Sequence, residues 1–93
     1  MKVRVTYMAV LRGVSEIPER EIEFNGSTLG DLVEFLRATE PAALKSRMFD
    51  ESSRMRADIV VFINDADSML TGGMAAPLKD GDEVVFLPSV HGG

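Results

Sequence analysis

Apolar and polar residues alternate in two stretches near the start of the chain. In residues 2–8 every second position is apolar, from Val3 to Tyr7, and the same period of two returns in residues 20–25. A period of two is typical of a strand that buries one face and exposes the other. Turn-forming residues separate the two stretches at Gly13–Pro18. The pattern therefore predicts two neighbouring strands.

The charges on the polar positions indicate how these two strands pair. Lys2 and Arg4 occupy the polar positions of the first strand, and Glu21 and Glu23 occupy those of the second. Opposite charges that face each other across two strands stabilise the pairing by about 0.2–1 kcal/mol each. We therefore expect an antiparallel pair.

A helix is predicted directly after the second strand. Asn25-Gly26 forms a turn, Ser27 or Thr28 can cap the first turn, and Asp31 lies near the positive end of the helix dipole. Four apolar residues then follow the helical spacing of three and four, and they are Leu29, Leu32, Val33 and Leu36. Glu40-Pro41 ends this helix, because the residue before proline avoids the helical region.

The second half of the chain predicts further strands. A short helix over Ala42–Met48 and a polar loop over Phe49–Asp58 lead to Ile59–Ile63, an apolar run typical of an interior strand. After a turn at Asn64-Asp65, Ala66–Leu70 is expected to form a short edge strand. A turn at residues 79–82 precedes the last strand, Glu83–Leu87, which Pro88 ends.

This order of elements predicts an α+β fold. Two strands, a helix and further strands make a mixed sheet of four to five strands with one main helix on one face, which is the ubiquitin-like β-grasp arrangement. We expect a single domain over residues 1–88 and a flexible C-terminal tail over residues 89–93. The apolar run 59–63 is far too short for a membrane span, and no targeting segment is visible. We therefore expect a cytoplasmic protein that does not bind membranes.

Composition narrows the chemistry further. Ten basic and fifteen acidic residues give a net charge of −5, which argues against nucleic-acid binding because a phosphate-binding surface needs an excess of basic residues. The chain has no Cys, so disulfides, thiolate metal sites and cysteine nucleophiles are excluded. One His is too few for a histidine metal site or a Ser-His-Asp triad of the usual kind. We expect no bound metal or cofactor.

Two other groups of residues carry no convincing site. Asp65 and Asp67 lack the ligand spacing of a calcium loop and are better interpreted as parts of a solvated turn. The methionines at positions 48, 69 and 74 are interpreted as residues that fill the core.

The C-terminus is the most informative segment for function. After Pro88 the chain continues as Ser89, Val90, His91, Gly92 and Gly93. Two glycines can enter a channel that excludes any residue with a side chain. Fully extended, five residues reach about 17 Å, which is far enough to bring the carboxylate of Gly93 into the active site of a partner.

These features resemble a known family. The segment Pro77–Pro88, which contains Leu-Lys-Asp-Gly-Asp-Glu-Val, together with Gly92-Gly93 and Asn64, resembles the ubiquitin-like sulfur carriers, such as the small subunit of molybdopterin synthase. His91 before the two glycines is similar to the ubiquitin-related modifiers that serve tRNA thiolation.

The resemblance implies a reaction at Gly93. An E1-like activating enzyme would use ATP to adenylate its carboxylate, and a sulfurtransferase or cysteine desulfurase would supply sulfur to leave a thiocarboxylate. In molybdopterin synthesis, residues 88–92 would enter the large subunit of molybdopterin synthase with Gly93, and that subunit supplies the acid–base groups. The chain would then be a cosubstrate without catalytic side chains, and His91 would contact the activating enzyme or a nucleotide phosphate, or remain exposed.

Other functions remain open at this point. Gly93 could instead form isopeptide bonds to lysines of target proteins, as a ubiquitin-like modifier does. The sulfur acceptor could belong to the tRNA, thiamine or cysteine pathway rather than to molybdopterin synthesis. A plain adaptor with an inert tail is the third class.

A docking surface is expected on the sheet. The strands at Ile59–Ile63 and Val84–Leu87 are apolar at consecutive positions, and only one face of a sheet can cover the helix. We therefore expect the opposite face to bind the partner, with Phe62 and either Val85 or Leu87 as anchors.

Overall fold

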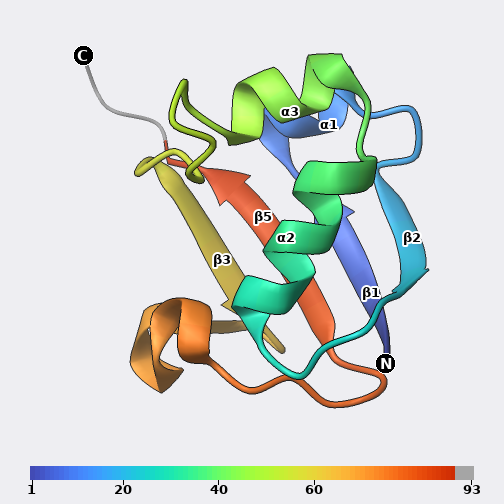
Figure 1. Cartoon of the computed structure of the whole chain (residues 1–93), viewed down its shortest axis with the longest axis vertical. Coiled ribbons are helices and arrows are strands. Elements are labelled where there is room, and N and C mark those ends of the chain that lie inside the picture. Colours follow the sequence, from blue (N-terminus) through green and yellow to red (C-terminus); the bar gives the residue numbers. More distant parts are fainter. Residues whose placement is uncertain (90–93) are drawn as a thin grey trace.

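The computed structural model describes residues 1–89 and contains a five-stranded sheet with the strand order β2-β1-β5-β3-β4 (Figure 1). The strands are β1 (Lys2–Tyr7), β2 (Glu19–Glu23), β3 (Ile59–Ile63), β4 (Ala66–Asp67) and β5 (Glu83–Pro88). The helices are α1 (Ala9–Val14), α2 (Leu29–Thr39), α3 (Ala42–Met48) and the 3-10 turns η1 (Ser68–Thr71) and η2 (Gly73–Ala75). This arrangement confirms the predicted α+β fold.

The predicted antiparallel pairing of the first two strands is confirmed. Lys2 lies opposite Glu23, and Arg4 lies opposite Glu21. The Arg4 guanidinium nevertheless donates to Glu19, at 3.0 Å, rather than to the residue directly opposite. Arginine can reach a diagonal partner because its side chain is long. On its other side β1 pairs with β5 in parallel, so the first and last strands occupy the centre of the sheet.

The main helix, α2, begins as the sequence indicates. Of the two candidate caps, Thr28 is the one used: its hydroxyl accepts from the backbone N–H of Asp31 at 3.2 Å. The Asp31 carboxylate accepts in return from the backbone N–H groups of Ser27 and Thr28, at 2.9 and 3.1 Å. This reciprocal capping box satisfies donors that a helix start leaves unpaired. The helix ends at Thr39, directly before Glu40-Pro41 as predicted.

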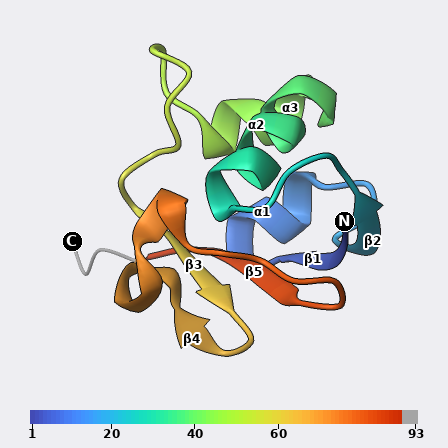
Figure 2. The same ribbon diagram turned by 60° about the horizontal axis from the view of Figure 1, so that its bottom comes forward.

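The helices α1, α2 and α3 lie together on one side of the sheet, and among residues 1–89 no helix covers the opposite side of β1 and β5 (Figure 2). Alternate strand residues point into the layer between sheet and helices, where the apolar stripe of α2 meets them. The most fully buried side chains include Tyr7, Leu11, Leu32, Leu36, Leu44, Met48 and Phe86. Within residues 1–89, no helix combines the length and the apolar character that crossing a bilayer would require.

A buried polar group interrupts this core beside β2. The Tyr7 hydroxyl donates to Glu40 at 2.8 Å, and the Arg20 guanidinium forms an ion pair with the other oxygen of the same carboxylate. Glu40 is only 6% exposed. Burial, followed by the hydrogen bond and the charge of Glu40, raises the pKa of Tyr7 well above its ordinary value. Arg20 thus ties the edge strand β2 to the end of α2.

Two expectations about the segment after β3 are wrong. The edge strand predicted for Ala66–Leu70 ends at Asp67, because the Asp67 carboxylate accepts from the backbone N–H of Met69 at 3.0 Å and starts η1. Met48 does fill the core, but the side chains of Met69 and Met74 are 76% and 44% exposed. The 3-10 turns carry these methionines outward, which the apolar pattern does not reveal.

The sequence analysis also missed α1. The residues 9–14 form only about one and a half helical turns, and Leu11 is the one fully buried side chain among them. Such a short segment with Gly13 and two valines has weak helical propensity, so no periodicity marks it. Its start is fixed by a tertiary contact, since the backbone N–H of Met8 donates to Phe86 at 3.1 Å.

Candidate functional site

The described chain leaves the sheet at the end of β5, beside the start of β3. Pro88 pairs with Ile59 in the antiparallel ladder. Ser89 then donates its backbone N–H and its hydroxyl to the carbonyl oxygen of Asp58, at 2.6 and 3.0 Å. Two hydrogen bonds therefore hold Ser89, the last described residue, at this end of the β3–β5 pair. We call the contact between Ser89 and Asp58 the exit clamp.

The loop before β3 positions this clamp. Its backbone is tied to α3, because the N–H of Arg56 donates to the carbonyl of Met48 at 2.8 Å and the Arg56 guanidinium donates to that of Ser46 at 3.1 Å. The Asp50 carboxylate accepts from two backbone N–H groups within the loop. Phe49 is buried under the same segment. The predicted polar loop is thus an ordered support for Asp58.

The uncovered face of the sheet carries a strip of four partly exposed apolar side chains. Phe62 lies opposite Val85, and Val60 lies opposite Leu87, so the four residues form two adjacent cross-strand pairs on β3 and β5. We call Val60, Phe62, Val85 and Leu87 the outer strip. It begins at the rung beside Pro88 and runs away from the exit clamp.

The structure therefore brings together the three residues that the sequence singled out for docking. Phe62, Val85 and Leu87 share one face, and their role as partner anchors stays a prediction. The sequence analysis missed Val60. Its position two residues before Phe62 on the same strand could have identified it, because strand side chains alternate between faces.

The loop that supports the exit clamp carries charges of both signs, and its acidic residues are Asp50, Glu51 and Asp58. Four basic residues lie on α3 and the following loop, and they are Lys45, Arg47, Arg54 and Arg56. The uncovered face of β2 instead carries Glu19, Glu21 and Glu23. Among residues 1–89, His, Cys, Asp and Glu form no group of three or more that could hold a metal ion.

The turn at residues 79–82 carried much of the family resemblance. It lies at the start of β5, at the opposite end of this strand from the exit clamp, and side-chain hydrogen bonds hold it in place. The Asn64 side chain donates to the Asp82 carboxylate and accepts from the backbone N–H of Glu83, each at 2.9 Å. Asp82 also accepts from the backbone N–H of Lys79 at 2.8 Å. Gly81 adopts a φ of +88°, in the left-handed region that favours glycine. This turn fixes where β5 begins. The length of β5 then fixes the position of its last residue, Pro88.

Of the predicted tail residues, the structure describes two. Pro88 is the last residue of β5, and Ser89 is part of the exit clamp. Val90, His91, Gly92 and the proposed reaction site Gly93 lie outside the described residues. The domain boundary after Pro88 stays a prediction. What the described site offers chemically is a partly exposed apolar strip and a fixed exit point.

Comparison with known proteins gives this site a family. The family Urm1 (Ubiquitin related modifier) matches residues 4–93. The sulfur carrier protein CysO of Mycobacterium tuberculosis is 32% identical over 95 residues, which span 100% of both chains. The molybdopterin synthase sulfur carrier subunit of the same organism is 34% identical over 95 residues, or 100% of this chain and 99% of that one.

A solved structure extends the likeness to three dimensions. The small archaeal modifier protein 1 of Methanosarcina acetivorans has a TM-score of 0.79 and 33% identity, and the match covers 99% of this chain and 96% of that one. The shared fold and the match through residue 93 agree with the resemblance found in the sequence. The chain belongs to the Urm1 family of ubiquitin-like sulfur carriers.

Proposed function

We propose that this sulfur carrier works through the carboxyl group of Gly93 and supplies the sulfur of molybdopterin. In this proposal the chain is the small subunit of a molybdopterin synthase, and the large subunit binds the cyclic pterin phosphate. The observation that carries the proposal is the 34% identity, over the whole chain, to a protein named as a molybdopterin synthase sulfur carrier subunit. We propose the cytoplasm as the compartment.

The chemistry requires activation of the terminus. A carboxylate is an anion at pH 7, with an ordinary pKa near 3.5, and is a poor electrophile. An E1-like enzyme would transfer AMP from ATP to the Gly93 carboxylate and release pyrophosphate. A persulfide sulfur would then attack the acyl carbon and displace AMP. A thiol would then attack the S–S bond of the resulting acyl disulfide, which leaves a thiocarboxylate on Gly93 and a disulfide between that thiol and the cysteine that had carried the persulfide.

The described fold would position this terminus and provide the surface that the partner binds. Four residues follow Ser89, and in an extended form they reach about 13 Å beyond the exit clamp. The outer strip supplies an apolar surface next to that exit, where a partner can bury Phe62 and Leu87. Docking the strip would therefore place the partner's active site within reach of Gly93.

Intact mass spectrometry tests the proposal. The chain is incubated with its E1-like enzyme, ATP and a persulfide-loaded sulfurtransferase, and we expect the mass change of one oxygen-to-sulfur exchange. A variant with one extra residue after Gly93 is the matched control, because its fold is intact and its terminal carboxylate is displaced. Sulfur transfer from the wild-type chain to the pterin, in the presence of the large subunit, then identifies the acceptor. Thiocarboxylate formation without transfer to the pterin would contradict the molybdopterin assignment.

A second candidate is covalent modification of proteins. The observation that favours it is the 33% identity to a small archaeal modifier protein. In that case the acyl adenylate would pass to a lysine amine as an isopeptide bond. No Lys or Arg follows Lys79 in the chain, so tryptic digestion would leave residues 80–93 attached to the target lysine. Detection of that remnant on another protein distinguishes a modifier from a pure sulfur carrier.

A further inference from the structure

The exit clamp depends on where the carbonyl oxygen of Asp58 lies, because this one atom accepts both hydrogen bonds of Ser89. Asp58 belongs to the loop, since β3 begins at the next residue. A loop residue lacks the regular ladder that fixes the backbone of a strand. The position of this carbonyl must therefore come from contacts that the loop makes with other elements.

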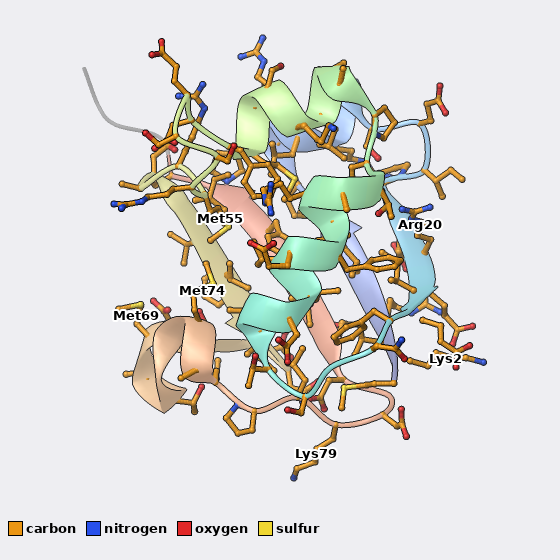
Figure 3. The ribbon with its side chains drawn as sticks, in the orientation of Figure 1. Lys2, Arg20, Met55, Met69, Met74 and Lys79 are labelled. Carbon is orange, nitrogen blue, oxygen red and sulfur yellow. The ribbon has the colours of Figure 1, made fainter. Side chains whose placement is uncertain are left out.

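The first part of the loop has its own anchors in the core. Phe49 and Met55 form an antiparallel bridge, and the backbone N–H of Asp50 donates to the carbonyl of Arg54 at 2.8 Å. Phe49 is buried, and Met55 packs against the same core cluster. Figure 3 shows Met55 toward the end of the molecule at which β3 begins. Residues 49–55 thus form a small closed loop that the core holds.

Arg56 connects this closed loop to both α3 and β3. Its backbone N–H donates to the carbonyl of Met48 at 2.8 Å, and its guanidinium donates to that of Ser46 through Nη2 at 3.1 Å and Nε at 3.3 Å. Both carbonyls lie in the last turn of α3, where a helix leaves C=O groups without partners. The Arg56 carbonyl accepts from the backbone N–H of Ile59 at 3.1 Å. Residues 57–58 are therefore held between two fixed points.

The guanidinium is the part of this connection that depends on the side chain. Two of its N–H groups converge on one oxygen, and a charged donor forms a stronger hydrogen bond than a neutral one. Arg54 is exposed on the same loop, but it contacts Asp50 through its backbone N–H and its carbonyl. The two arginines thus differ in what their side chains do, although they carry the same charge.

We infer that Arg56 is a positioning residue for the reaction at Gly93. Its guanidinium holds the loop against α3, the loop holds the Asp58 carbonyl, and this carbonyl holds Ser89 where the tail departs. The inference rests on the proposed function. A change of direction at Ser89 is amplified along the tail, which reaches about 13 Å when extended. Reacting atoms must approach to within about 3–3.5 Å, so a misdirected tail reacts slowly.

This role separates turnover from affinity. The outer strip is proposed to bind the partner, and Arg56 lies outside this strip. Loss of the guanidinium should therefore leave the affinity unchanged, while fewer bound chains present the Gly93 carboxylate in a geometry that reacts. In kinetic terms kcat should fall, and KM for the chain should stay the same.

Arg56→Gln tests the inference, and Arg54→Gln is the matched control because it removes the same charge from the same exposed loop. ATP–pyrophosphate exchange by the E1-like enzyme is measured over a range of chain concentrations. We expect Arg56→Gln to lower kcat by roughly fivefold or more and to change KM by less than about twofold. Arg54→Gln should react like the wild type. Arg56→Lys keeps the charge and one donor, and it should restore part of the rate.

Amide hydrogen exchange in the free chain reports the clamp directly. Arg56→Gln should speed exchange of the Ser89 amide by roughly threefold or more and leave that of Phe86, in the centre of the sheet, unchanged. A variant that only lowered global stability would instead speed every amide that exchanges by complete unfolding. Combined with Ser89→Ala, Arg56→Gln should lower kcat by less than the product of the two single effects, because both changes act on the Asp58 carbonyl.

A partner that encloses the tail also reaches Arg56, because Arg56 and Asp58 line one pocket of about 440 Å³. If KM rises in Arg56→Gln while the Ser89 amide exchanges as in the wild type, Arg56 contacts the partner directly and the inference is overturned. Equal kcat values of Arg56→Gln and Arg54→Gln, or fully multiplicative effects of Arg56→Gln and Ser89→Ala, would also overturn it.

One outcome concerns the proposed function instead. If the wild-type chain supports no ATP–pyrophosphate exchange with the E1-like enzyme, the proposed function fails, and the inference fails with it. If the wild type reacts and Arg56→Gln reacts equally well, the inference alone fails.

Discussion

Ser89 donates two hydrogen bonds to a single acceptor, the carbonyl oxygen of Asp58, from its backbone N–H at 2.6 Å and from its hydroxyl at 3.0 Å. Asp58 directly precedes β3, and Ser89 directly follows β5. The contact therefore extends the β3–β5 ladder by one rung beyond Pro88. It sets the point and direction from which the proposed reactive end departs.

Removing the hydroxyl oxygen of Ser89 should weaken the exit clamp. Ser89→Ala removes the hydroxyl and keeps the backbone bond, and we expect a loss of about 0.5–1.5 kcal/mol in the free energy of unfolding. Urea denaturation measures this loss. Ser52→Ala is the control, because Ser52 is exposed and only its backbone N–H is bonded. Thiocarboxylate formation should slow in the Ser89 variant. An unchanged rate would show that the clamp does not guide the terminus.

The outer strip can be tested with a single charge. Leu87→Asp places a carboxylate in the apolar surface that the partner is proposed to bury, and burying an unpaired charge is strongly unfavourable. We expect binding to the E1-like enzyme to weaken by roughly a hundredfold or more in calorimetric titrations.

The matched control for this charge is Ile17→Asp, which adds the same group at a site that is 54% exposed and away from the strip. Circular dichroism should show both variants folded. Equal affinity of the two variants would remove the strip from the interface.

The buried Tyr7 makes stability depend on pH in the alkaline range. Its folded pKa is raised, chiefly by burial and then by the hydrogen bond to Glu40 and by the charge of that carboxylate. Because the protonated form is favoured in the folded state, this stability is fully present below the unfolded pKa of about 10 and is lost as pH rises above it. Urea titrations between pH 8 and pH 11, as a rough range, should show the decline.

The variant Tyr7→Phe separates the two contributions of this hydroxyl. At neutral pH it should lower the free energy of unfolding by about 1–3 kcal/mol, since it leaves a buried carboxylate oxygen without its donor. It should also remove most of the decline above pH 10, where the phenol would otherwise ionise. A decline of the same steepness in the variant would assign the alkaline effect to other groups.

The capping box makes stability depend on pH in the acid range. Backbone hydrogen bonds from Ser27 and then Thr28 lower the pKa of Asp31. The ionised carboxylate is therefore favoured in the folded state, and its contribution is present above the unfolded pKa of about 3.9 and lost as pH falls through the folded value. Asp31→Asn should flatten this part of the pH profile in thermal unfolding.

The reciprocal half of the box offers an independent check. Thr28→Ala removes the hydroxyl that accepts from the Asp31 N–H, and it should cost about 1 kcal/mol. This loss should be present at pH 7 as well as in acid, because a hydroxyl does not titrate there. If Thr28→Ala and wild type unfold alike at neutral pH, the cap is not stabilising.

Local patterns predicted most of the elements, because their causes lie within a few neighbouring residues. Alternation identified β1 and β2, and the charges of Lys2 and Arg4 gave the pairing with β2. The helix α2 followed from its cap and its apolar stripe. Phe62, Val85 and Leu87 could be named as candidate anchors because their strands are apolar at consecutive positions, which is a local pattern, although Val60 was missed.

Other features escaped the sequence because their causes are distant along the chain. The short helix α1 depends on a contact with Phe86, and the inward position of Arg20 depends on Glu40 at the end of α2. The early end of β4 depends on the Asp67 side chain, which starts η1. None of these contacts leaves a periodic signal.

The amino-acid sequence by itself determined most of the order of strands and helices and excluded cysteine chemistry. Its Gly92-Gly93 pair also identified Gly93 as the candidate reaction site. Only the tertiary structure decided where that terminus departs and what surrounds the departure point. Ser89 meets Asp58 across a separation of 31 residues, and β4 ends at Asp67 because the carboxylate of that residue starts η1. Hydrogen bonds between distant residues are settled by which strands become neighbours, and that depends on packing of the whole chain.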